Sequence, residues 1–275
     1  MRSHLSSPWN NAVSVLEMRF GTTRLSTGSC FLWSHGERSF LVTNWHNLAG
    51  RNPHTGQPMS ATAALPDRVT FRAFKQVSEP DAHGIYEVAS VEIDAPLEDA
   101  ATGMPRWREH PTYGRLVDVA ALEVTDKLLG HEHAGVNRLE SDALLDEYVS
   151  QDVFIVGYPF GLIAGAPAPI WKRGTIALDP TFNPDDLPKL LVDTATREGM
   201  SGSVVLARHT LVHSRYKKRN GELVLFPAAY AVLDVVLGIY SGRHYPDQER
   251  AQLGIVWKRS SIEETVSAGR PPVFG

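Results

Sequence analysis

VDTATREGMSGSVVL, residues 192–206, is the stretch of the sequence with the most specific local chemistry. Gly199 and Gly202 flank the Met200-Ser201 pair, so the backbone can turn tightly with little Cβ obstruction and direct successive N–H groups into one pocket. Such amides stabilise the negative oxygen of a tetrahedral intermediate. The stretch therefore predicts a nucleophilic Ser201, with the amides of Gly199 and Ser201 as an oxyanion hole. A plain glycine-serine turn between two strands has the same appearance.

Two earlier stretches carry the other groups that a serine nucleophile needs. In FLVTNWHNLAG, residues 40–50, an apolar run leads to His46 in a turn after a strand. Its imidazole, with an ordinary pKa of about 6.5, can take a proton from a hydroxyl near neutral pH. In LVDVAALEV, residues 116–124, Asp118 interrupts an apolar strand-like run, and a buried carboxylate needs a partner such as a histidine N–H. Taken alone, each also has a structural explanation: an ordinary histidine, and an aspartate that caps the strand or meets an arginine.

Short apolar runs separated by turn residues are spread over the whole chain, which is typical of β-strands. The expected strands are 13–20, 28–33, 39–43, 69–74, 86–93, 117–124, 153–157, 172–178, 190–194, 203–207, 231–240 and 252–257. Helical signals are few. One weak helix is expected from Leu139 to Tyr148, between two strand-rich halves. A closing helix is expected near the end, where Ser260 and Glu263 have the spacing of a capping box. Ile262 and Val266 would share one face of it.

The three chemical stretches occur in the order His46, Asp118, Ser201 on this β-rich background. In these features the sequence resembles the chymotrypsin-like (trypsin-fold) serine proteases, and especially disulfide-poor bacterial members such as the HtrA-type proteases. The similarity covers roughly Thr27 to Trp257 and is strong only in short motifs. The matching motifs are Thr27-Gly28-Ser29-Cys30-Phe31, Leu41-Val42-Thr43-Asn44-Trp45-His46 and Asp118-Val119-Ala120-Ala121-Leu122. In the HtrA-like branch an aspartate stands eight residues before the nucleophile, as Asp193 does here.

The resemblance implies an all-β fold of two packed antiparallel β-barrels with a short C-terminal helix. Residues 1–135 would form the half that carries His46 and Asp118, and residues 136–275 the half that carries Ser201 and the helix. The implied activity is that of a serine endopeptidase, which cleaves peptide bonds through an acyl-enzyme intermediate with these three residues as its catalytic triad and without a cofactor.

The resemblance also assigns the substrate pocket to two stretches, one just before the nucleophile and one in a later strand. These residues are Ala195, Thr196, Arg197, Glu198, Tyr240, Ser241, Gly242 and Arg243. Because Ala195 would bring no negative charge to the base of the pocket, we expect no preference for lysine or arginine.

The sequence departs from the family pattern at two positions. Ser203 replaces a glycine that is common after Gly202, and Met200 replaces the aspartate of digestive members. Any regulation is therefore expected to act by ordering the loop 196–200.

The composition limits the partners and the setting. The 275 residues are 43% hydrophobic and 21% charged, as in a folded globular protein, and the net charge of −4 provides no positive field for nucleic acid. Cys30 is the only cysteine, so no internal disulfide can form. The N-terminus has no signal-like apolar core, and no stretch approaches the about 20 apolar residues of a membrane span. We expect a cytoplasmic protein that binds a protein or peptide substrate and an activating protein, but neither nucleic acid nor a membrane.

Other readings remain open at this stage. A protein of the protease fold that binds a partner with little or no catalytic activity would keep the same residues. An α/β-hydrolase esterase is disfavoured because its triad runs in the order Ser, Asp, His and its helices alternate with strands. His131 and His133 lie two residues apart but lack an evident third ligand, so no metal site is expected. The basic run from Arg215 to Arg219 is interpreted as a solvated hairpin tip, and Cys30 as a buried, inert thiol.

Overall fold

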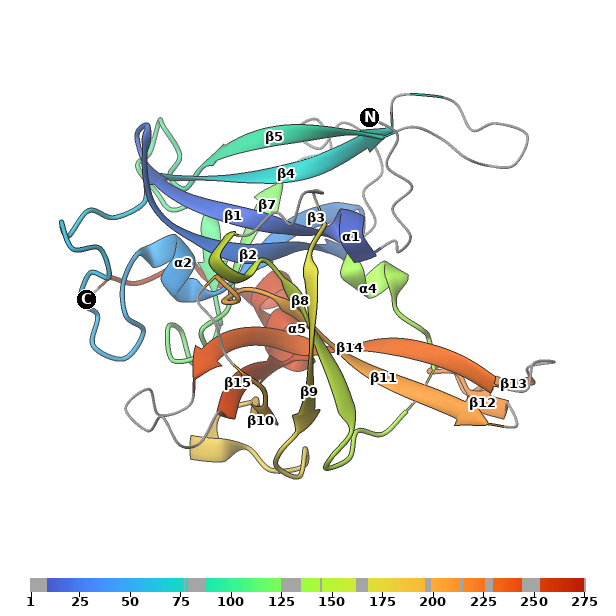
Figure 1. Ribbon diagram of the computed structural model, residues 1–275. Coiled ribbons are helices and arrows are strands. Elements are labelled where there is room, and N and C mark those ends of the chain that lie inside the picture. Colours follow the sequence, from blue (N-terminus) through green and yellow to red (C-terminus); the bar gives the residue numbers. More distant parts are fainter. Residues whose placement is uncertain are drawn as a thin grey trace.

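The computed structural model describes residues 9–76, 78, 88–124, 135–143, 145–161, 168–195, 199–212, 215–225, 230–243 and 253–274. It is mostly β, with one sheet built from the first half of the chain and a closed barrel built from the second (Figure 1). The all-β prediction, including the short C-terminal helix, is confirmed. Among the described residues, no helix has the length and apolar character that a bilayer crossing requires.

The first half forms a seven-stranded antiparallel sheet in the order β5-β4-β1-β2-β3-β7-β6. Its strands are β1 (Val13–Phe20), β2 (Thr23–His35), β3 (Arg38–Thr43), β4 (Arg68–Gln76), β5 (Val88–Pro96), β6 (Trp107–Glu109) and β7 (Ala120–Val124). The short helix α1 (Trp9–Ala12) precedes β1, and α2 (Trp45–Ala49) follows β3. A hairpin joins β2 to β3, with Gly36 at a φ of 59°.

The second half forms a closed antiparallel barrel in the order β10-β15-β14-β11-β8-β9. Its strands are β8 (Asp152–Gly157), β9 (Ile170–Ile176), β10 (Lys189–Asp193), β11 (Val204–Val212), β14 (Tyr230–Arg243) and β15 (Leu253–Lys258). Two 3₁₀ turns, η1 (Pro159–Gly161) and η2 (Pro184–Asp186), lie in its connections. The basic run belongs to a small hairpin, β12 (Arg215–Lys217) with β13 (Leu223–Leu225), at the far end of β11 and β14 (Figure 1). Lys217 and Arg219 are exposed, but Arg219 also pairs with the buried carboxylate of Glu140, so the run is not only a solvated tip.

Apolar side chains fill three separate cores, one inside each half and one between them. Successive residues of a strand point to opposite faces. In β11, Val204 and Leu206 therefore enter the core between the halves, while Val205 and Ala207 enter the barrel. Strands β2 and β3 divide their side chains in the same way. Burial on both faces explains why these strands are continuous apolar runs in the sequence.

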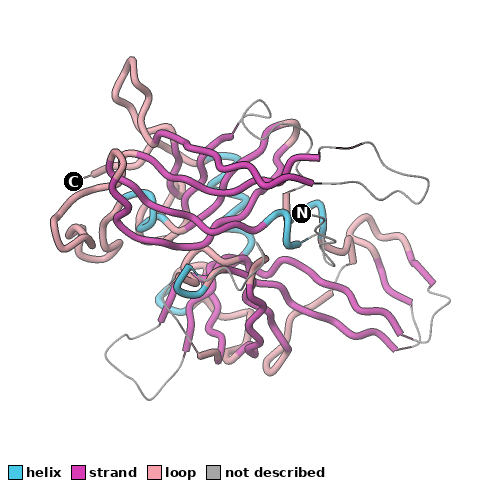
Figure 2. Tube along the Cα trace, turned by 45° about the horizontal axis from the view of Figure 1, so that its top comes forward, coloured by secondary structure: helices cyan, strands magenta, loops and turns pink. Residues whose placement is uncertain are grey.

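The C-terminal helix α5 (Arg259–Ala268) packs against both halves (Figures 1 and 2). As predicted, Ile262 and Val266 share its buried face, and both belong to the core between the halves. The predicted capping box is wrong. The N-cap residue is Lys258, without a side-chain cap, and Glu263 instead forms an i,i+4 ion pair with Arg259 over 2.6 Å. The helix begins two residues earlier than the capping-box spacing requires.

The helix predicted from Leu139 to Tyr148 is also wrong. The only helical turn there among the described residues is α4 (Val136–Leu139), which ends where that prediction begins. Glu140 leaves the helix because its buried carboxylate accepts a hydrogen bond from the Val236 backbone N–H (2.8 Å) and forms ion pairs with Arg219 and Arg259. Ser141 then donates its N–H to Asp234 of β14. Tertiary partners override the weak local helical preference.

Candidate active site

Strand pairing brings His46 and Asp118 together. Strand β3 pairs with β7 so that Thr43 lies opposite Ala120, and His46 follows β3 by three residues while Asp118 precedes β7 by two. The prediction that Asp118 interrupts a strand is therefore wrong, because β7 begins after it. The His46 Nδ1 atom lies 2.7 Å from Asp118 Oδ2, and the His46 backbone N–H donates to Asp118 Oδ1 over 2.9 Å. Asp118 is buried, and the His46 side chain is partly exposed.

The contact between His46 and Asp118 favours the charged form of each side chain. Burial lowers the pKa of His46, but the negative charge of Asp118 and the hydrogen bond to it outweigh burial, so the His46 pKa lies above its ordinary value. Burial raises the pKa of Asp118, but His46 and the hydroxyl of Ser241 outweigh it, so the Asp118 pKa lies below its ordinary value. Asp118 is thus an anion that holds and orients the imidazole.

The turn that carries Ser201 has the backbone that its glycines predict. Gly199 and Gly202 have φ values of +83° and +87°, a region that L side chains seldom adopt. A Cβ atom on Gly199 would lie 2.6 Å from both the Tyr158 carbonyl oxygen and the Phe160 nitrogen, so this close approach also requires glycine. The Gly202 N–H donates to the Tyr240 carbonyl oxygen, which ties the turn to β14.

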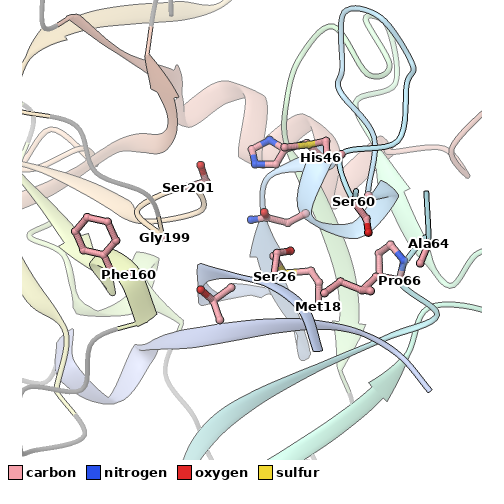
Figure 3. A pocket seen from close by; sticks show the side chains of 14 residues that line it. Met18, Ser26, His46, Ser60, Ala64, Pro66, Phe160, Gly199 and Ser201 are labelled. Carbon is pink, nitrogen blue, oxygen red and sulfur yellow. The ribbon is translucent and has the colours of Figure 1, made fainter. Parts of the chain in front are cut away.

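His46 and Ser201 line the same cavity, which has a volume of about 540 Å³ (Figure 3). Within the described part of the chain, no hydrogen bond joins the Ser201 hydroxyl to the imidazole, and none occupies the N–H of Gly199 or of Ser201. The cavity wall therefore carries the Ser201 hydroxyl, the His46 imidazole and two backbone N–H groups. The two N–H groups have no hydrogen-bond partner among the described residues. This combination of groups suits acyl transfer.

Ser203, the departure from the family pattern, fits because a glycine faces it. A Cβ atom on Gly157 would lie 1.9 Å from Ser203 Oγ and 2.7 Å from Ser29 Oγ. Ser203 is fully buried, and its hydroxyl has no hydrogen-bond partner among the described residues. The family often has a glycine at the position of Ser203. Here Gly157 of β8 is the residue without a side chain, and it leaves room for the side chain of Ser203.

The residues predicted to bind substrate are placed differently from one another. Ala195 is exposed after β10, and Gly242 and Arg243 end strand β14. Tyr240 is buried in the barrel core, and the Ser241 hydroxyl donates to Asp118 Oδ2 over 2.5 Å. Thr196, Arg197 and Glu198 lie outside the described residues, as do His131 and His133.

Asp193 is exposed at the end of β10. Cys30 is buried as predicted, and burial raises the pKa of its thiol.

A family model described as the trypsin-like peptidase domain matches residues 28–212, a range that includes His46, Asp118 and Ser201. The chain belongs to this family. The predicted resemblance is confirmed by this match. A search of curated proteins found no match to this trypsin-like peptidase domain.

Solved structures similar to this trypsin-like domain include proteases of two bacteria. The serine endoprotease from Yersinia pestis is 13% identical with a TM-score of 0.48, and the match covers 94% of this chain but 62% of that one. The active form of the Rv3671c protease from M. tuberculosis is 16% identical with a TM-score of 0.47, covering 96% of this chain and 84% of that one. The inactive form of the same protease is 16% identical with a TM-score of 0.45, covering 94% and 88%.

Several polar residues at this site of the trypsin-like domain were not identified from the sequence. The Asn44 side chain donates to the Asp118 carbonyl oxygen over 2.7 Å, and Ser241 was assigned to substrate rather than to Asp118. Ser29, which appeared only as part of a matching motif, donates its hydroxyl to the Gly199 carbonyl oxygen. Their partners are 74 to 170 residues away in the chain, so local sequence patterns contain no sign of these bonds.

Proposed function

We propose that this trypsin-like domain is a serine endopeptidase that cleaves peptides or proteins through an acyl-enzyme intermediate. The observation that carries the proposal is the 2.7 Å contact from His46 Nδ1 to a buried Asp118, with Ser201 on the wall of the same cavity. The contact leaves Nε2, the other ring nitrogen of His46, to exchange a proton with a hydroxyl. The fold provides the geometry, and no cofactor takes part in the proposed reaction.

In the proposed reaction, Ser201 Oγ attacks the peptide carbonyl carbon while His46 takes the hydroxyl proton. The amides of Gly199 and Ser201 bind the negative oxygen of the tetrahedral intermediate. His46 then gives the proton to the leaving amine, and water releases the acyl group by the same route. The first step requires a hydrogen bond from the Ser201 hydroxyl to His46, and such bonds are often long before substrate binds.

The cavity indicates which part of the substrate it binds. Ser241 and the end of β14 lie on the Asp118 side, where the family resemblance places the acyl part of the substrate. The cavity extends from His46 and Ser201 in another direction, toward Met18 and Pro66 of the first half (Figure 3). Met59 of the first half also lines it. We infer that it receives the leaving-group part, with an apolar side chain just after the scissile bond.

Labelling with a fluorophosphonate probe tests the proposed function, because the probe reacts only with an activated serine. We expect wild type to be labelled, Ser201→Ala to show no labelling, and His46→Ala to lose most of it. Ser203→Ala is the matched control: it removes a nearby buried hydroxyl that has no partner among the described residues, and it should be labelled like wild type. A folded wild type without labelling at Ser201 would favour the alternative, a binding protein of the protease fold.

A further inference from the structure

We propose that Ser29 is a positioning residue that holds the two amides of the oxyanion hole in place, a role that rests on the proposed function. Ser29 lies in β2 of the first half and is fully buried. Its hydroxyl donates to the Gly199 carbonyl oxygen over 2.9 Å, and its backbone N–H donates to the Ser201 carbonyl oxygen over 2.8 Å. One residue of the first half thus binds the carbonyls of both residues whose N–H groups would hold the oxyanion.

The hydroxyl of Ser29 also joins a third segment to this arrangement. It accepts a hydrogen bond from the Tyr158 backbone N–H over 2.9 Å. A hydroxyl has one donor and two acceptor positions, so the Ser29 side chain uses its only proton on Gly199. Gly199 itself packs against the backbone of Tyr158 and Phe160. The oxyanion turn is therefore held between Ser29 on one side and the turn that follows β8 on the other.

The position of Ser29 is itself fixed. Its carbonyl oxygen accepts the Thr43 hydroxyl over 2.8 Å, and the Asn47 side chain donates to that same hydroxyl over 2.9 Å. Thr43 ends β3, and Asn47 lies in α2 beside His46. A buried chain of hydrogen bonds thus connects the helix of the candidate base to the turn of the candidate nucleophile. Such connected networks restrict motion more than isolated bonds do.

The variant Ser29→Ala removes the two side-chain bonds and keeps the backbone bond to Ser201. The Gly199 carbonyl then loses its anchor, and the oxyanion amides become less well placed. Removal of an entire oxyanion donor lowers kcat roughly 10²- to 10³-fold in measured cases, so we expect loss of its support to lower kcat about 10- to 100-fold. KM should change little, because the ground-state substrate does not use the oxyanion site.

Binding of a peptide boronic acid separates this role from general structural support. The probe forms a tetrahedral adduct with the serine and needs the oxyanion site, whereas a matched non-covalent peptide amide does not. We expect Ser29→Ala to weaken boronic acid binding by about the same factor as kcat/KM and to leave amide binding unchanged. Ser203→Ala, from the same buried layer, should leave kcat and both affinities unchanged. Urea unfolding of each variant checks folding, and Ser29→Gly replaces the alanine variant if that one does not fold.

The possible outcomes separate the two proposals. If wild type reacts with the fluorophosphonate but Ser29→Ala retains wild-type kcat and boronic acid affinity, Ser29 has no positioning role and the proposed function stands. If Ser29→Ala only lowers stability, or weakens amide and boronic acid binding equally, the positioning role is also overturned. If folded wild type does not react at all, the proposed function fails and this role fails with it.

Discussion

The Asp118 carboxylate accepts three hydrogen bonds, from the His46 ring, the His46 backbone N–H and the Ser241 hydroxyl. These donors keep the carboxylate ionised in a buried position, where an unpaired charge would be costly. Two of them come from His46 itself, so the ring and the backbone of that residue are fixed by one side chain. At the residue scale, Asp118 therefore determines both the orientation and the protonation of the candidate base.

A pH dependence follows from the raised pKa of His46. The proposed reaction needs neutral His46, so kcat/KM rises with pH through the His46 pKa, and we expect the midpoint to lie above the ordinary value of about 6.5. Asp118→Asn removes the negative charge and leaves burial, which lowers the pKa, so the midpoint should move to lower pH. In the same variant kcat should fall by roughly 10³- to 10⁴-fold.

Histidine titration by NMR measures this shift even where activity is too low to follow, with His46→Ala used to assign the resonance. Ser203→Ala serves as the control, and its His46 should titrate as in wild type. An unchanged midpoint in Asp118→Asn would show that the contact seen in the structure does not control the base.

Single residues differ in how far the sequence reveals them. His46, Asp118 and Ser201 each lie in a short motif whose chemistry is recognisable, and the structure brings all three to one region. Ser29 is not recognisable in this way, because its hydroxyl bonds to Gly199 over a separation of 170 residues. The fit of Ser203 against Gly157 could not be predicted for the same reason, since it depends on strand pairing between β8 and β11.

At the element scale, α5 and the residues after it fasten the second half to the first. Arg270 forms an isolated β-bridge with Glu109, with backbone bonds of 2.9 and 3.1 Å, and its side chain pairs with the Glu109 carboxylate over 3.2 Å. The buried Glu109 carboxylate also accepts the Trp45 ring N–H over 2.9 Å. Phe274 packs near the rings of Trp45 and Trp107. The segment after α5 thus lies against the residue that precedes His46.

Loss of the Arg270 side chain should destabilise the fold. Arg270→Ala leaves Glu109 buried without its countercharge, and breaking a buried pair costs about 3–5 kcal/mol, which we reduce to about 1–2 kcal/mol because Arg270 is half exposed. Urea unfolding followed by tryptophan fluorescence measures the free energy of unfolding, since Trp45 lies at this contact. Arg24→Ala, which removes an exposed arginine with a long 3.6 Å pair, is the control and should change stability by less than about 0.5 kcal/mol. Equal stabilities for the two variants would disprove the fastening role.

Strands were easier to predict than helices in this chain. Strands such as β11 are buried on both faces, so their apolar runs are visible in the sequence. The two helical predictions relied on weaker signals. The C-terminal helix was found from Ile262 and Val266, but its first turn contains an Arg259–Glu263 ion pair and no capping box. The helix predicted from Leu139 to Tyr148 is absent because Glu140 binds partners that are distant in the sequence.

At the scale of the whole molecule, the cavity lies where the two halves meet. Met18 and Met59 come from the first half, and Phe160 and Gly199 from the second. The large core between the halves, to which α5 contributes, fixes their relative position. The resemblance predicted a site between two β units, but the apolar character of this cavity could not be predicted. Part of its apolar lining, Met59, Ala64 and Pro66, comes from the segment 51–66, whose sequence contains no apolar run that would indicate a binding surface.

Substrate preference tests this cavity. Met59 is 59% exposed, so Met59→Ser should not affect folding. We expect the variant to lower kcat/KM about three- to tenfold for peptides with a large apolar residue just after the scissile bond, because the lost apolar contact is worth about 1 kcal/mol. Peptides with glycine at that position should be cleaved as by wild type. Met104→Ser, at an exposed methionine that is not among the cavity residues, is the control. An equal loss for both peptides would contradict the assignment.

The order of strands in the barrel has a consequence for the newly made protein. Strand β15 lies between β10 and β14, and β14 holds the Ser201 turn through Tyr240. Because translation proceeds from the N-terminus, the barrel cannot close until residue 258 has left the ribosome. A growing chain that already contains Ser201 therefore lacks the support that its turn needs. If the proposed function is correct, a competent site forms only after nearly the whole second half has been synthesised.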